Sequence, residues 1–116
     1  MESKSLTPLF CWTVLYPNKE GASFDFERYS KVLIPEYVEI LGNNCVKYEV
    51  RKGLATPGAV VPNFACIVNI WVTSREKFRE SMVDPRMKVL MEKVSAVTDM
   101  QSIRQLDEVI ASNSAL

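Results

Sequence analysis

Tyrosine side chains at helical spacing are the first groups in this sequence that suggest chemistry. Tyr29 and Tyr37 would share one face of an α-helix with Leu33, which lies midway between them. A phenol on such a face either packs in the core or serves as an acid or hydrogen-bond donor. Because its unperturbed pKa is about 10, a phenol is a better acid than base at neutral pH. We take Tyr29 as a candidate catalytic residue, and Leu33 and Tyr37 as candidate substrate-binding residues.

Tyr16 is a second candidate, because it ends an apolar run just before the turn residues Pro17 and Asn18. In a strand, Trp12 lies on the same side as Tyr16, since four residues span two strand periods. Tyr16 is then either an amphipathic residue with one end in water or a catalytic phenol at the mouth of a pocket. In the second case Trp12 helps to bind the substrate.

Asn69 and Trp71 share one side of an otherwise apolar stretch, NFACIVNIWVT. A buried amide costs free energy unless it is hydrogen-bonded. Its partner is either a group on a neighbouring strand or in a second copy, or a substrate carbonyl, in which case Asn69 is catalytic and Trp71 is a stacking wall. The other residues expected to bind the substrate are Tyr48, Phe78, Met87 and Met91.

The absence of histidine excludes imidazole acid-base catalysis, Ser-His and Cys-His nucleophile pairs, and metal sites that contain histidine. The three cysteines, Cys11, Cys45 and Cys66, are far apart and lack C-x-x-C spacing. They predict buried free thiols in a reducing compartment rather than metal ligands. We therefore expect no metal site.

Charge and hydropathy exclude several kinds of partner. Lys plus Arg equals Asp plus Glu, at 14 each, so nothing favours binding to nucleic acid or to an anionic membrane. No apolar run approaches the roughly 20 residues that span a bilayer. The first residues, MESKSLTPLFCW, lack the apolar core of a secretion signal. A cytoplasmic protein is the expectation by default.

The apolar pattern predicts six elements in the order β-α-β-β-α-β. Two strands are apolar on both faces, so they are central in the sheet, whereas one alternates and lies nearer an edge. The predicted strands are Leu9–Tyr16, Cys45–Lys52, Asn63–Thr73 and a segment within Asp99–Ile110; the helices start at Asp25, with a kink at Pro35, and at Ser74, with a restart at Asp84. We predict a single ferredoxin-like α+β domain over residues 1–116, with a four-stranded antiparallel sheet and helices on one face.

This architecture leaves one face of an apolar sheet uncovered. If the helices cover one side, the central strands still need apolar contacts on the other side. A second copy of the sheet would supply them, so we predict a homodimer packed sheet to sheet.

Short motifs along most of the chain resemble the EthD-like family of the dimeric α+β-barrel superfamily. They are LYPN at Leu15–Asn18, GASFD at Gly21–Asp25, Tyr29, the pair Ile34-Pro35, and Thr98-Asp99-Met100 before the last strand. The resemblance implies a dimeric barrel with no metal and no organic cofactor, and a pocket between the helices and the sheet of each subunit. Relatives act on small hydrophobic molecules, often polyketide-derived.

One family position departs from the pattern. The family commonly has a histidine just before the Met-Pro or Ile-Pro pair, and Leu33 occupies that position here. Either the chemistry depends on other residues, or it needs no base, or the protein only binds its ligand.

Three functions remain open at this point. The first is a cofactor-free enzyme of polyketide-type secondary metabolism, a cyclase, isomerase or lyase. It would use confinement, and hydrogen bonds from tyrosine and asparagine to an enolate-like oxygen. The second is a non-catalytic protein that binds a small hydrophobic molecule, and the third is a structural dimer with a filled core. The resemblance adds cofactor-free monooxygenase activity as an alternative.

Overall fold

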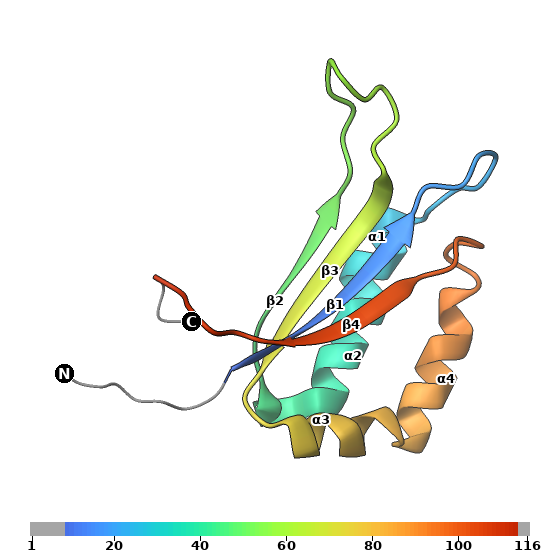
Figure 1. Ribbon diagram of the computed structural model, residues 1–116. Coiled ribbons are helices and arrows are strands. Elements are labelled where there is room, and N and C mark those ends of the chain that lie inside the picture. Colours follow the sequence, from blue (N-terminus) through green and yellow to red (C-terminus); the bar gives the residue numbers. More distant parts are fainter. Residues whose placement is uncertain (1–8, 114–116) are drawn as a thin grey trace.

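The protein consists of a four-stranded antiparallel sheet with helices on one face (Figure 1). The structure is a computed structural model and describes residues 9–113. The strand order is β2-β3-β1-β4, so β1 and β3 are central. The strands are β1 Phe10–Pro17, β2 Cys45–Lys52, β3 Phe64–Val72 and β4 Ile103–Glu108. This arrangement confirms the ferredoxin-like βαββαβ fold, with the alternating strand β2 at an edge as its pattern indicates.

Two helical segments cross the same face of the sheet. The first is continuous but changes its winding, and the second is broken before Pro85 (Figure 1). The successive parts are α1 Phe26–Arg28, the π-helix η1 Tyr29–Leu33, α2 Ile34–Leu41, the 3-10 turn η2 Gly42–Asn44, α3 Arg75–Met82 and α4 Pro85–Val94. None of the helices between residues 9 and 113 is both long and apolar enough to cross a membrane.

Asp25 starts the first helical segment as expected. Its Oδ1 accepts a hydrogen bond from the backbone N–H of Arg28 at 3.1 Å, which satisfies one of the free donors of the first turn. The rings of Phe24 and Tyr29 pack edge to face with their centroids 5.2 Å apart. This contact is the hydrophobic staple that fixes the angle at which the chain enters the helix. It also holds Tyr29 at a fixed position over the sheet.

The kink expected at Pro35 takes the form of a π turn just before it. Proline has no N–H to donate to the carbonyl of Lys31, and its ring would clash with that carbonyl in an α-helix. The helix widens instead, and the N–H of Ile34 bonds to the carbonyl of Tyr29, five residues back. The extra residue in this turn changes which side chains face the sheet.

The change in phase can be estimated from the α-helical rotation of about 100° per residue. Twelve α-helical steps from Tyr29 to Leu41 would place these side chains about 120° apart around the axis. Because the π turn takes up one extra residue, the rotation from Tyr29 to Leu41 equals that of eleven α-helical steps. The angle between the two side chains around the axis is then about 20°. Tyr29, Leu33, Tyr37 and Leu41 are accordingly all buried, with exposed fractions of 1–5%.

The register of the central strands decides which residues face the helices. Trp12 pairs with Ile70 and Tyr16 with Cys66, and these residues point toward the helices. Thr13 pairs with Asn69 on the other side of the sheet, which we call the open face. Cys66, Val68, Ile70 and Val72 are fully buried, so β3 forms the centre of the core.

Candidate functional site

A cavity of about 560 Å³ lies between the helices and the sheet, in the range typical of small-molecule sites. β1 and β3 form its floor, η1, α2 and α4 its walls, and the connection from α4 to β4 one side. Ser95, Asp99, Gln101 and Arg104 line it and are exposed, so the cavity opens to solvent along that connection. Its existence contradicts a structural dimer with a filled core.

Seven of the residues expected in the site line this cavity. They come from β1, the first helical segment and α4, and are Trp12, Tyr16, Tyr29, Leu33, Tyr37, Met87 and Met91. The π turn and the strand alternation described above bring them together. Leu33, at the position where the EthD-like resemblance implies a histidine, is 1% exposed, so an apolar side chain fills that place in the cavity wall.

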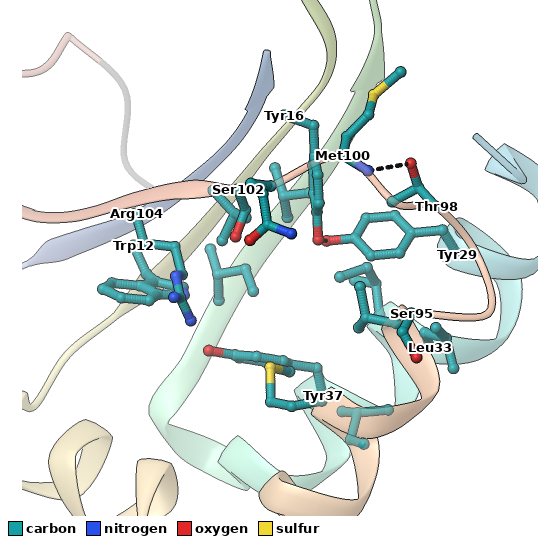
Figure 2. A pocket seen from close by; sticks show the side chains of 18 of the residues that line it. Trp12, Tyr16, Tyr29, Leu33, Tyr37, Ser95, Thr98, Met100, Ser102 and Arg104 are labelled. Atoms are coloured by element: carbon teal, nitrogen blue, oxygen red, sulfur yellow. Dashed lines mark hydrogen bonds between the residues drawn. The ribbon is translucent and has the colours of Figure 1, made fainter. Parts of the chain in front are cut away.

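The hydroxyl groups of Tyr16 and Tyr29 form a buried pair. Their oxygens are 3.0 Å apart, and their rings pack edge to face with centroids 5.5 Å apart. Figure 2 shows the two hydroxyls pointing toward one another. Burial raises the pKa of Tyr29 far above its ordinary value, and the neighbouring Tyr16 adds to the rise. Burial also raises the pKa of Tyr16, against the lowering effect of its hydrogen bond to Tyr29. Both phenols therefore stay neutral at pH 7 and can act as donors but not as bases.

Tyr37 contributes a third phenol across the cavity from this pair (Figure 2). Its hydroxyl donates to the Sδ of Met82 at 3.6 Å. Burial raises its pKa, while a hydrogen bond with Trp12 and the charge of Arg104 act in the opposite direction. Like the other two phenols, Tyr37 is a neutral donor at physiological pH.

The segment from α4 to β4 supplies site residues that sequence reasoning missed. Gln101, Ser102 and Arg104 line the cavity, and Arg104 lies opposite Val14 on the helix-facing side of β4. Strand alternation in β4 places Arg104 on the same side as the apolar Leu106, and this pattern is the sequence feature that points Arg104 toward the helices. The irregular apolar pattern of that strand left its orientation undetermined.

The Thr98-Asp99-Met100 motif closes one side of the cavity. Thr98 Oγ1 accepts from the backbone N–H of Met100 at 3.0 Å, and the backbone of Thr98 pairs with Phe24. The backbone N–H of Asp25 donates to the carbonyl of Val97 at 3.0 Å. These bonds tie the segment to the start of the first helix.

Asn69 and Trp71 do not reach the cavity, which corrects their expected placement. They lie on the open face, because β3 alternates and Asn69 pairs with Thr13 rather than with Trp12 or Tyr16. The amide Nδ2 of Asn69 donates to Thr13 Oγ1 at 2.9 Å, a partner on the neighbouring strand. Trp71 packs under the Nζ of Lys47, 5.2 Å from its ring centroid.

Tyr48 and Phe78 also lie outside the cavity lining. Tyr48 is 40% exposed on β2, an edge strand that has a neighbouring strand on one side only. Phe78 is buried in α3, where its ring packs against Trp12 at 5.0 Å. Phe78 therefore supports a cavity residue from behind instead of touching the space itself.

Between residues 9 and 113, no group of three or more His, Cys, Asp or Glu side chains is arranged to hold a metal ion. Among the described lining residues, the side-chain donors are phenols, hydroxyls, an indole, an amide and a guanidinium. Such a set can stabilise a negative oxygen but offers no strong base.

Solved structures with this fold include proteins of several kinds. An EthD-like protein from Ralstonia eutropha JMP134 superimposes with a TM-score of 0.84 at 28% identity, covering 94% of this chain and 98% of that one. Hydroxynitrile lyase from Passiflora edulis gives 0.65 at 10% identity, covering 94% and 100%. SnoaB, a cofactor-independent oxygenase from Streptomyces nogalater, gives 0.62 at 10% identity, covering 95% and 100%. A dimeric ferredoxin-like protein from Thermobifida fusca YX gives 0.57 at 10% identity, covering 88% and 92%.

These similarities confirm the EthD-like resemblance that the motifs indicate. They also show that the fold is shared with a cofactor-independent oxygenase, a lyase and a dimeric ferredoxin-like protein. No protein-family model and no curated protein sequence matches the chain.

Proposed function

We propose that this EthD-like protein of the dimeric α+β-barrel superfamily is a cofactor-free enzyme of polyketide-type secondary metabolism. Its reaction is a non-redox cyclisation, isomerisation or elimination on a small hydrophobic, aromatic molecule. The observation that carries the proposal is the convergence of three neutral phenols, Tyr16, Tyr29 and Tyr37, on an otherwise largely apolar cavity. Apolar pockets with few, well-placed polar groups are typical of small-molecule sites.

The phenols would act on negative charge that develops during the reaction. An enolate-like oxygen beside the Tyr16–Tyr29 pair would accept a hydrogen bond that strengthens as its charge grows. The apolar walls would hold the substrate in a shape close to that of the reacting state, which lowers the entropic part of the barrier. The phenols are neutral, and Asp99, the carboxylate among the described lining residues, is exposed and ion-paired with Lys19, so reactions that need a general base are disfavoured.

The names of two relatives support chemistry of this kind. One is a hydroxynitrile lyase and another is a cofactor-independent oxygenase, so the fold accommodates lyase chemistry and also oxygenation without a cofactor. For this chain we favour the non-redox reaction, since hydrogen-bond donors and confinement are sufficient for it. Monooxygenase activity remains the alternative within the same cavity.

A non-catalytic binding protein is the second candidate, and one observation favours it. Leu33 is buried and apolar at the position where the EthD-like resemblance implies a histidine. Asp99 is the carboxylate among the described lining residues, and its side chain is 67% exposed and ion-paired with Lys19. A protein that has lost its base would bind the ligand and release it unchanged.

Native mass spectrometry of the purified protein, followed by release of anything bound, tests the function. The proposal predicts a species of twice the chain mass of 13.2 kDa that carries a small aromatic or polyketide-like molecule. Incubating that molecule with fresh protein would yield a product if the protein is an enzyme. Recovery of the unchanged molecule would instead support the binding protein, and a cavity that takes up no aromatic molecule would contradict both.

Dimerisation through the open face belongs to the same proposal. Leu15, Ile67 and Trp71 lie on that face and are only half-buried in the single chain. A second sheet packed at about 10 Å would cover them. The polar residues Asn69 and Thr13, already bonded to each other, could enter such an interface without losing hydrogen bonds.

Replacing Ile67 with aspartate is expected to convert the dimer to a monomer. A carboxylate on each of two facing sheets would be desolvated and would repel its copy, at a cost of several kcal/mol. Size-exclusion chromatography with light scattering measures the mass. Val89→Asp is the matched control, because Val89 is 53% exposed on α4, away from the open face. An Ile67→Asp variant that keeps the wild-type mass would contradict this interface.

A further inference from the structure

The cavity contains a positive charge that no carboxylate between residues 9 and 113 neutralises. Two charged residues line it, Asp99 and Arg104. The Oδ2 of Asp99 is 3.7 Å from the Nζ of Lys19, so its charge is already compensated. Arg104 forms no ion pair with any residue in the described part of the chain. The charge of Arg104 is therefore available to a ligand.

The backbone directs the Arg104 side chain toward the cavity. Arg104 pairs with Val14 in the β1–β4 register, and Val14 faces the helices. Figure 2 shows the guanidinium beside Trp12, on the same side of the cavity as the hydroxyl of Tyr37. Burial raises the pKa of Tyr16 and Tyr37, and the positive charge of Arg104 opposes both rises, which places it near both phenols.

The wall opposite this cation is apolar. The residues of α4 that line the cavity are Met87, Leu90, Met91 and Val94, and they present sulfur and aliphatic groups suited to an aromatic ring. Gln101 and Ser102, which shortly precede Arg104 in the chain, also line the cavity and add hydrogen-bonding groups. The cavity therefore combines an apolar wall from α4 with a cation and hydrogen-bonding groups from the chain that follows α4.

We propose that the ligand is an aromatic carboxylate, with its ring against α4 and its carboxylate on the guanidinium of Arg104. A planar guanidinium matches a planar carboxylate through two parallel hydrogen bonds. A single cation beside neutral phenols suits one negative charge better than the two of a phosphate group. This inference rests on the proposed function in placing the substrate in the cavity, and it names the substrate class.

Calorimetric titration with 2-naphthoate and 2-naphthamide tests the inference, since the two probes share a ring system and differ in charge. Wild-type protein is expected to bind the carboxylate about tenfold or more tightly than the amide, because hydrogen bonds to charged groups are stronger than neutral ones. Arg104→Gln is expected to remove that preference and leave the affinity for the amide unchanged. Arg104→Lys is expected to keep part of it.

Arg79→Gln is the matched control for the loss of one positive charge. Arg79 lies on α3, is exposed and pairs with Glu76 at 2.8 Å, outside the cavity lining. This variant is expected to keep the wild-type preference. Thermal melts of all variants check folding, and because Arg104 is an exposed residue of an edge strand, its replacement should leave the fold intact.

Three results would overturn the inference. They are equal binding of the two probes to the wild-type protein, an equal loss of both affinities in Arg104→Gln, and no binding of either probe. The second would show that the arginine only packs against the ligand. A carboxylate preference without turnover would support the inference while contradicting the enzyme, so the two proposals fail on different measurements.

Discussion

Replacing Tyr29 with phenylalanine is expected to reduce turnover by about 10²–10³-fold, the usual effect of removing one donor from an oxyanion site. The change deletes one oxygen of the Tyr16–Tyr29 pair and keeps the ring that packs on Phe24. The measurement is the rate of conversion of the molecule released from the purified protein. A rate within a factor of two of wild type would contradict the role of this hydroxyl.

Tyr48→Phe is the matched control, since it deletes a phenol oxygen from a residue 40% exposed on β2 and outside the cavity lining. It is expected to change neither turnover nor stability.

Tyr29→Phe also leaves the hydroxyl of Tyr16, a residue 4% exposed, without its partner. We therefore expect a loss of about 1–3 kcal/mol in the free energy of unfolding, measured in urea. Removing both hydroxyls in Tyr16→Phe/Tyr29→Phe is expected to recover part of this loss.

Alkaline pH is expected to destabilise the fold strongly. Burial raises the pKa of Cys66 from 9.0 to about 12, and it also raises the pKa values of Tyr16, Tyr29 and Tyr37. The folded state therefore holds these protons more tightly than the unfolded state does. The resulting stability is complete below about pH 9 and is lost as the pH rises toward 12.

The expected size follows from the shift at Cys66. By pH 10.5 this thiol alone is expected to cost about 2 kcal/mol, at 1.36 kcal/mol for each unit of pKa. Urea unfolding at pH 7.5, 9.0 and 10.5 measures it. Cys66→Ala is expected to lower stability at pH 7.5, because it leaves a cavity, but to show a weaker decline above pH 9. A free energy of unfolding that stays constant to pH 10.5 would contradict the burial of these groups as neutral acids.

The local patterns of the sequence were sufficient to predict the fold. Asp25 and Gly42 bracket the first helical segment, and Ser74 and Asp84 start the two parts of the second. The double-sided apolar runs predict central strands, and the predicted strand ends lie within one residue of those observed for β1 and β3. Capping and alternation act over a few residues, so a single sequence records them directly.

The candidate site was harder to predict, because it depends on which side of the sheet each strand shows to the helices. Trp12 and Asn69 both lie on central strands apolar on both faces, where alternation defines two sides without telling which side is covered. The β1–β3 register, a tertiary property, places Asn69 on the open face. Arg104 was missed for the same reason, since β4 has too few apolar residues to reveal its buried side.

The π turn at Tyr29–Leu33 also has an evolutionary consequence. A π turn inside an α-helix is equivalent to the insertion of one residue, and such insertions leave the flanking helix intact. One added codon would rotate the helix residues before the insertion by about 100° around the helix axis relative to those after it. In this chain that rotation aligns Tyr29 with Tyr37 over the cavity. An ancestor with an uninterrupted helix would have presented a different side chain to its ligand, so a single insertion could change the chemistry of the site without changing the fold.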